Sequence, residues 1–298
     1  VWNNKYDRIL EDIFDVQDEI VRKISYTLFG EIELSSLQRA NRKPTDTLSS
    51  YELLLKGKAL HHKVQKDALL NALDTFDSAI KADEKNGQAY AWKACALGQG
   101  LFRGYIEEDF SVVWKQAEDN LKKARELNEN DFEVHRLMSE VTLAMKDFRA
   151  AQRHSNLAYD MVPNDPRVLS VYGDVCVRTG KVDEGVDALK LALDLDPIPQ
   201  GKTNADPRHA GLLFAYYMSR DKDGCLEQIG HLDEIDVRSW LITTKICSDE
   251  EHDYENLDWF KEGKKLFADK DWGKVVPDFR LNNDSASEAL IEFGKGLF

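Results

Sequence analysis

The feature that most constrains this 298-residue chain is a repeat with a period of 34 residues. Ala124, Ala158 and Ala192 each stand three residues before a leucine or a methionine, and a turn sequence rich in Asn, Asp or Pro follows each pair. Both intervals between successive alanines are 34 residues, and an earlier copy at Ala79 is displaced to 45 residues. A fixed period of this length indicates one supersecondary unit stacked on copies of itself.

The best copy, residues 166–199, shows why the period matters physically. Gly173 and Ala192 place small residues in the middle of its two expected helices, where helices approach closely. Gly180 supplies the turn, and Pro197 ends the second helix. This pattern resembles the tetratricopeptide repeat (TPR), a pair of antiparallel helices. The sequence therefore predicts an all-α fold, a TPR-type right-handed α-solenoid of antiparallel helix hairpins.

The repeat divides the chain into three expected parts. Residues 1–48 are predicted to be an N-terminal helix and linker, the end of a preceding domain, with helical periodicity from Asp7 to Gln38. Residues 49–199 hold four TPR-like repeats. Residues 200–298 are predicted to be a degenerate repeat and C-terminal capping helices, because terminal repeats close an open core. The helices expected in this last part cover 207–219, 223–232, 237–247, 256–268 and 285–296.

Two further local patterns give specific expectations. Asp165 and Asp206 each precede a proline, so each is predicted to cap a helix with proline at the first helical position. The second repeat also carries an insertion around Leu101–Ile106. This segment either lengthens a packed hairpin or forms an aromatic, ligand-contacting loop at the edge of the groove, and the sequence leaves both alternatives open.

Residues 1–57 carry a second resemblance. The stretches Val1–Arg8, Asp12–Ile20 and Tyr51–Gly57 are similar to sequences in certain bacterial signalling proteins, and so is the ending, residues 290–298. Those proteins carry a class III adenylate/guanylate cyclase domain or a winged-helix DNA-binding domain, then a TolB-like α/β region, and then TPRs. The resemblance implies that this chain is the TPR-repeat C-terminal region of such a protein, a regulatory or sensory half separated from its output domain.

Composition narrows the function classes. The formal net charge of −14 argues against a general nucleic-acid or anionic-membrane binder, because both need a basic surface. No apolar stretch approaches the roughly 20 residues that span a bilayer, and no signal peptide opens the chain. The four cysteines are far apart without a CxxC pair, which is typical of a reducing compartment, although disulfides or zinc ligation remain alternatives. We therefore expect a cytoplasmic location and no membrane span.

The sequence contains no catalytic motif, so the chain is predicted not to be an enzyme and to need no cofactor. His61 and His62 are adjacent, and neighbouring helical residues point about 100° apart, which makes a poor shared metal site. The acidic run at 248–253 lacks the central glycine of an EF-hand. No metal site is predicted.

In a TPR stack the first helix of each hairpin lines the concave face. The exposed groove positions predicted from the repeat phase are Lys58, His61, Trp92, Gln99, Arg136, Glu140, Arg167, Asp174 and Arg178. The three arginines predict a locally basic groove that suits an acidic peptide or a carboxylate terminus, although mixed surface charge without a ligand fits equally well. The Lys/Asn clamp of chaperone-binding TPRs is not matched by Glu133, Glu140 and Asp174.

These observations lead to a ranked functional prediction. The leading hypothesis is a TPR protein-interaction and regulatory module of a bacterial adenylate cyclase-like signalling protein, with a protein or peptide partner. The alternative is a small-molecule-sensing helical domain that controls a cyclase or DNA-binding output domain. An enzyme built on an α-solenoid is the third possibility, and no motif supports it.

Overall fold

The computed structural model describes residues 30–43, 48–199 and 202–298. All regular structure in these ranges is helical. Of the helix predicted between Asp7 and Gln38, residues 30–38 are described and helical, and the helix continues to residue 40. The other residues of that prediction, with the resembling stretches Val1–Arg8 and Asp12–Ile20, lie outside the described residues.

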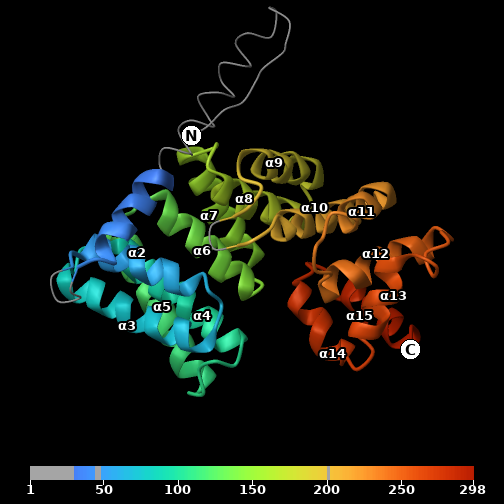
Figure 1. The fold of residues 1–298 in the computed structure, drawn as a ribbon, viewed down its shortest axis with the longest axis horizontal. Helices are drawn as coiled ribbons and strands as arrows, with labels where there is room; N and C mark the ends of the chain where they lie inside the picture. The colour runs from blue at the N-terminus through green and yellow to red at the C-terminus, as the bar shows by residue number, and fades with distance from the viewer. Residues whose placement is uncertain (1–29, 44–47, 200–201) are drawn as a thin grey trace, which may run out of the picture.

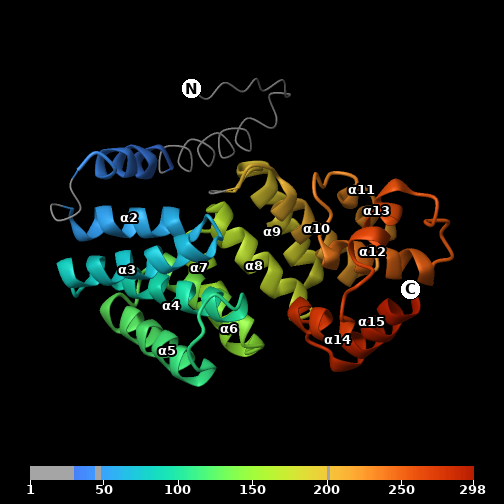
Figure 2. The same ribbon diagram turned by 60° about the horizontal axis from the view of Figure 1, so that its bottom comes forward.

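Four antiparallel helix hairpins follow in chain order and stack side by side (Figures 1 and 2). They are α2 (Ser50–His61) with α3 (Lys66–Ala82), α4 (Gly87–Phe102) with α5 (Phe110–Leu127), α6 (Phe132–Ala144) with α7 (Phe148–Met161), and α8 (Pro166–Arg178) with α9 (Val182–Leu195). The predicted all-α, TPR-type solenoid of helix hairpins is confirmed.

The C-terminal part continues as helices. They are α10 (Asp206–Ser219), α11 (Lys222–Ile229), α12 (Val237–Asp249), α13 (Asp258–Leu266), α14 (Trp272–Val275), the 3-10 helix η3 (Val276–Phe279) and α15 (Asp284–Gly296). Each of the five helices expected from the sequence in this region has a counterpart. The short pair α14 and η3 was not predicted, because four-residue helices leave no periodicity to detect. No helix in the described part of the chain is long and apolar enough to cross a membrane.

Aspartate side chains begin many of the helices. The Asp165 carboxylate accepts hydrogen bonds from the backbone N–H groups of Arg167 and Val168, as predicted, and Pro166 stands in the first turn. The corresponding prediction for Asp206 is wrong. Ala205 is the N-cap of α10, and the Asp206 carboxylate instead accepts from the backbone N–H groups of Asp233 and Glu234 at 2.9 Å each. A tertiary contact thus replaces the local cap.

Small residues let the two helices of a hairpin touch at the backbone. A Cβ added to Gly185 would lie 2.7 Å from the carbonyl oxygen of Gly173 and 2.6 Å from Cγ2 of Val177. A Cβ added to Gly57 would lie 2.4 Å from the ring of Phe76. Gly180 has φ +93°, so it closes the turn after α8 in a conformation that favours glycine. The small residues that recur in the repeat therefore mark the positions where the two helices of a hairpin contact each other.

The inserted segment lengthens a hairpin. Helices α4 and α5 have 16 and 18 residues, against 13 and 14 for α8 and α9. In the connection, Ile106 packs against Gly100, and the Tyr105 hydroxyl donates to the carbonyl oxygen of Val64 at 3.2 Å. Of the two alternatives for the insertion, these residues show the packed hairpin.

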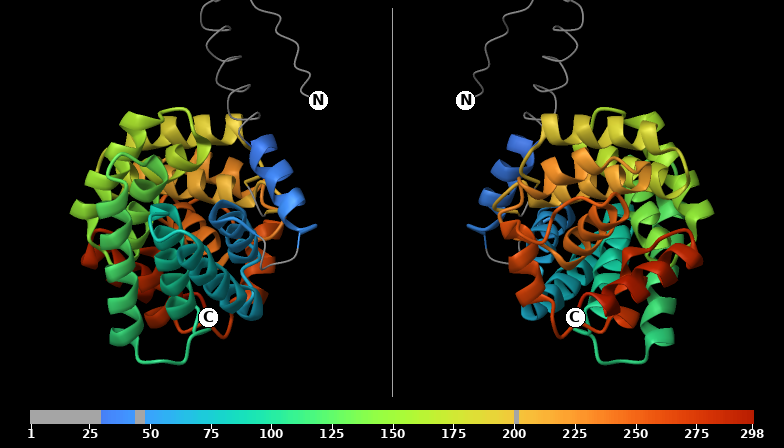
Figure 3. Two further views of the ribbon diagram at one scale, coloured as in Figure 1. Left: turned by 90° about the vertical axis from the view of Figure 1, so that its left-hand side faces the viewer. Right: turned by 90° about the vertical axis from the view of Figure 1, so that its right-hand side faces the viewer.

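Figure 3 views the solenoid along its long axis, and individual side-chain contacts join its C-terminal part to earlier hairpins. One apolar core joins α2 to α6, and another gathers around Trp240 in the C-terminal helices. Arg178 of α8 donates to the carbonyl oxygens of Phe279 and Arg280, and the Arg280 guanidinium lies 5.7 Å from the centroid of the Phe102 ring. These contacts position the first helices of the hairpins around a shared interior.

The close approach at Gly185 gives a stability prediction. Gly185→Ala should lower the free energy of unfolding by about 1 to 3 kcal/mol, because the added methyl group meets backbone atoms that cannot rotate away. Gly211→Ala is the matched control, since its Cβ would meet only Leu189 Cδ2 at 3.8 Å. Urea denaturation followed by circular dichroism measures both. Equal stabilities of the two variants would contradict this account of the packing.

Candidate functional site

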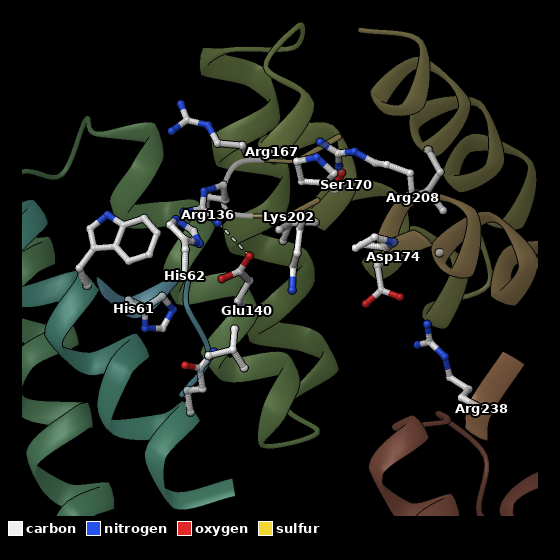
Figure 4. A pocket seen from close by; sticks show the side chains of 18 of the residues that line it. His61, His62, Arg136, Glu140, Arg167, Ser170, Asp174, Lys202, Arg208 and Arg238 are labelled. Atoms are coloured by element: carbon white, nitrogen blue, oxygen red, sulfur yellow. Dashed lines mark hydrogen bonds and ion pairs between the residues drawn. The ribbon is translucent and has the colours of Figure 1, made fainter. Parts of the chain in front are cut away.

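The first helices of successive hairpins line an open cavity of about 500 Å³ (Figure 4). Its walls come from α2, α4, α6, α8, α10 and α12, with Leu189 of α9 and residues of the connections that follow α2, α4 and α9. Seven of the nine predicted groove residues line it, namely His61, Trp92, Gln99, Arg136, Glu140, Arg167 and Asp174. Lys58 and Arg178 do not line it. That these residues bind a partner stays a prediction.

The expected exposure of this set is wrong for five of its members. Their exposed fractions are 3 to 6%, for Lys58, His61, Trp92, Arg136 and Arg178. The repeat phase gives the face of a helix on which a residue lies. It does not reveal that the helix at residues 30–40 and the C-terminal segment pack over parts of that face, as the contacts of Lys58 and Arg178 show.

A buried carboxylate stands at the centre of this face. Glu133 of α6 is 2% exposed, and Arg136 Nε donates to its Oε2 at 2.9 Å. Its Oε1 lies 3.9 Å from Lys58 Nζ and 3.8 Å from an Arg167 NH group. Burial alone would raise the pKa of Glu133, but the charges of Arg136, Arg167 and Lys58 outweigh it and hold this pKa well below its usual range. Glu133 is thus an ionised anchor.

Two of the cations around Glu133 each bind a second glutamate. Lys58 Nζ donates to Glu33 Oε1 at 2.8 Å, which joins the helix at residues 30–40 to α2. Arg136 also donates to Glu140 Oε1 at 2.8 Å, and this second carboxylate, 38% exposed, faces the cavity. Arg136 is therefore neutralised by two glutamates and holds Glu140 in position.

One end of the cavity is aromatic. The rings of His61, His62 and Trp92 lie with centroids 5.4 to 5.6 Å apart, and the cations of Lys58 and Arg136 each lie 5.4 Å from the Trp92 centroid. Burial lowers the pKa of His61 to about 4 and that of His62 to about 3, so both are neutral at pH 7. No group of three or more metal-ligating side chains occurs among the described residues.

Buried polar atoms without hydrogen-bond partners gather at this end. Four of the five such atoms among the described residues are here, His61 Nδ1, Trp92 Nε1, Gln99 Oε1 and Glu133 Oε1; the fifth is Thr243 Oγ1 of α12. Three of these residues, His61, Trp92 and Gln99, line the cavity, where solvent or a bound ligand can supply the hydrogen bonds.

Two arginines, Arg208 and Arg238, line the other end of the cavity, and Arg178 lies behind its wall. Arg208 is buried and paired with Asp196 at 3.0 Å, so it is structural. Arg178 binds both oxygens of Asp174 at 3.0 Å. Arg238 of α12 lines the cavity and makes no ion pair in the described part of the chain; its guanidinium donates to the Ala210 carbonyl oxygen at 3.4 Å.

Four Lys or Arg residues of this lining were missed by sequence reasoning. Arg103 and Lys202 lie in connections, and Arg208 and Arg238 lie in the degenerate part of the chain, where the repeat phase could not be carried forward. A search for unassigned basic residues after Pro197 would have found Lys202, Arg208 and Arg238 but could not have placed them.

Comparisons with known proteins support the fold. No family model and no curated protein matches the chain. A crystal structure of the APC/C hetero-tetramer Cut9–Hcn1 aligns with 89% of this chain and 45% of that chain, at 14% identity and a TM-score of 0.59. A structure from the functional characterisation of Pseudomonas aeruginosa PilF aligns with 84% of this chain and 95% of that chain, at 14% identity and a TM-score of 0.50.

A TPR protein from Thermus thermophilus aligns with 74% of this chain and all of its own, at 18% identity and a TM-score of 0.47. At these identities the similarity concerns the fold. The chain spans less than half of the Cut9–Hcn1 chain that it matches.

The buried charge cluster gives the next prediction. Glu133→Gln should lower the free energy of unfolding by about 3 to 5 kcal/mol, because three cations lose their shared carboxylate. Glu140→Gln, whose side chain is 38% exposed, should cost no more than about 1 kcal/mol.

The two variants also differ in their expected pH dependence. Because folding lowers the pKa of Glu133, its contribution is present above the unfolded pKa and is lost as pH falls towards the folded one. Urea titrations at neutral and acidic pH should therefore show the gap between wild type and Glu133→Gln narrowing in acid. A gap that is small at neutral pH would refute the anchor role.

Proposed function

We propose that this chain is a TPR protein-interaction module that binds a peptide segment of a protein partner, with an acidic group of that peptide in the cavity. The observation that carries the proposal is the origin of the cavity, because the first helices of consecutive hairpins contribute to one concave surface. Concave surfaces of this kind are the binding faces of helical-repeat proteins in general.

The charge of the cavity supports an acidic ligand. Six cationic and two acidic residues line it, in a chain whose formal net charge is −14. Arg103 and Lys202 are exposed there, and Arg238 has no ion pair within the described residues. Guanidinium groups that converge on one space favour carboxylates by charge-assisted hydrogen bonds.

The buried network beneath the cavity supports binding in a second way. Arg136 and Arg178 are 5% exposed, so they act as positioning residues that fix Glu140 and Asp174 on the cavity wall. A wall whose side chains are already held loses little conformational freedom when a ligand binds. Alanine substitution of these two arginines would therefore report on folding as much as on binding.

Selection from a displayed library of random peptides tests the proposal. We expect peptides enriched in Asp and Glu, and we expect the affinity of the best peptide to fall at least about tenfold in Gly211→Trp, which fills the cavity. Gly211→Ala leaves the volume almost unchanged and should bind as wild type does. Selection without acidic enrichment, or equal binding by Gly211→Trp, would count against an acidic peptide in this cavity.

The cavity volume favours one alternative. About 500 Å³ lies in the range of small-molecule sites, so a small-molecule-sensing domain is the second candidate. It would be preferred if no peptide were selected while a defined metabolite raised the melting temperature of wild type and not of Gly211→Trp.

We also propose that the module is the regulatory part of a bacterial adenylate cyclase-like signalling protein. The resemblance of residues 1–57 and 290–298 supports this role; residues 1–29 and 44–47 are outside the described ranges. Addition of a selected peptide to the natural polypeptide that contains this chain should change its rate of cyclic-nucleotide formation, while the isolated chain should form none. A natural polypeptide without a cyclase domain would refute the cyclase link.

A further inference from the structure

The two ends of the cavity differ in the kind of group that lacks a partner. At one end Arg238 is a cation that makes no ion pair in the described part of the chain. At the other end the groups are neutral, because His61 Nδ1, Trp92 Nε1 and Gln99 Oε1 are buried atoms without a hydrogen-bond partner. All three residues line this cavity, and Figure 4 shows His61 on the opposite side of it from Arg238.

One face of α4 and the end of α2 bring the three neutral residues together. Trp92, Cys95 and Gln99 follow one another at intervals of three and four residues, so they lie on one face of α4. The His61 ring packs against that face. Its centroid is 5.4 Å from the Trp92 centroid, and its Nε2 is 3.8 Å from Cys95 Sγ. His61, Trp92 and Gln99 therefore form one local group, which we call the Trp92 end of the cavity.

The hydrogen-bonding roles of these atoms are limited. The indole N–H of Trp92 can only donate, and Gln99 Oε1 accepts. His61 is neutral at pH 7, because burial lowers its pKa to about 4. If its proton is on Nε2, which faces the Cys95 sulfur, then Nδ1 is an acceptor. The Trp92 end then presents one donor and two acceptors.

No charge at the Trp92 end calls for an ionic ligand group. The cations of Lys58 and Arg136 each lie 5.4 Å from the Trp92 centroid. Glutamates already bind them, one for Lys58 at 2.8 Å and two for Arg136 at 2.8 and 2.9 Å. Arg103, one turn beyond Gln99, is exposed and stays hydrated. A carboxylate beside Trp92 would thus lose its hydration and meet cations whose charge is already neutralised.

The Trp92 end also restricts the size of a ligand group. His61 and Trp92 are 6% and 3% exposed. Their rings and that of His62 meet edge to face, with centroids 5.4 to 5.6 Å apart. The ring faces are therefore largely covered, so a large aromatic ligand cannot stack on them, whereas a small polar group of a few atoms fits.

We infer that the Trp92 end binds the side-chain carboxamide of an asparagine or glutamine in the peptide ligand. A primary carboxamide is small and neutral, and it has one acceptor oxygen and two N–H donors. Its oxygen would accept from Trp92 Nε1–H, and its two N–H groups would donate to Gln99 Oε1 and His61 Nδ1. A peptide bond has a single N–H and would leave one acceptor unmatched.

This inference rests on the proposed function, because it gives the same peptide a second contact. The acidic group lies among the arginines, and the carboxamide lies at the Trp92 end. A site whose buried polar atoms are completed by the ligand discriminates strongly against ligands of similar shape that cannot make those hydrogen bonds. The carboxamide would therefore contribute mainly to specificity.

Peptides selected on the full chain provide the first test. We expect an Asn or Gln at a fixed spacing from the acidic residue. In calorimetric titrations of the best peptide, replacing this residue by Glu, which adds a charge, or by Met, which removes the hydrogen bonds, should each weaken binding at least about tenfold.

Variants of the protein provide the second test. Gln99→Met and Trp92→Phe each remove one hydrogen-bonding atom, and each should weaken binding of the carboxamide peptide at least about tenfold. Both variants should bind the Met-substituted peptide about as wild type does. Gln116→Met, on the exposed side of α5, and Trp114→Phe, whose indole N–H donates to Glu118 at 3.0 Å, are the matched controls outside the cavity. Both should bind the carboxamide peptide as wild type does.

The melting temperature separates binding from folding. Gln99 Oε1 has no partner in the free protein, so Gln99→Met should leave the melting temperature without peptide unchanged or raised. A loss of affinity in this variant would then report on the ligand. An equal loss in Gln116→Met would overturn the inference.

Failure of the inference and failure of the proposed function give different results. Acidic peptides that lack an enriched Asn or Gln, or that bind Gln99→Met as tightly as wild type, would show that water alone satisfies the Trp92 end. The carboxamide inference would then be wrong, and the acidic-peptide function would stand if Gly211→Trp still weakened binding. A selection that yields no peptide would overturn both.

Discussion

A single buried carboxylate, that of Glu133, connects three of the four N-terminal helix hairpins. Glu133 accepts a hydrogen bond from Arg136 on its own helix and lies within 4 Å of cations from α2 and α8. Through Lys58 it also reaches Glu33, in the helix that precedes the repeats. Each ion needs the others, since a charge removed from water is tolerated only when it is paired. The relative placement of hairpins one, three and four therefore depends on electrostatics as well as on apolar packing.

This cluster explains why the interior of the solenoid is polar. Small residues such as Gly173 and Gly185 bring the helices of one hairpin together, and the hairpins then curl. The first helices face inward, so charged side chains that would be solvated in a flat array are covered. The two ends of the cavity therefore differ in charge: neutral histidines lie beside Trp92 at one end, and arginines line the other.

The C-terminal helices complete the arrangement and give it a second charge centre. Arg178 satisfies Asp174 and the carbonyl oxygens after η3, which fixes the segment that carries Arg280. Around Glu133 the cations are compensated by three glutamates, Glu33, Glu133 and Glu140. At the second centre Arg178 binds Asp174, and Arg238 lines the cavity without an ion pair among the described residues.

The sequence by itself determined the helix hairpins, because the spacing of Ala124, Ala158 and Ala192 reflects contacts made within one repeat and its neighbour. It also placed seven residues on the wall of one cavity, since each first helix repeats the same face. It could not show that Arg136 and Arg178 are buried, that Asp206 binds a distant turn, or that Arg178 binds the carbonyl oxygens of Phe279 and Arg280. Those features join residues from about 30 to more than 100 positions apart, so only the curl of the tertiary structure decided them.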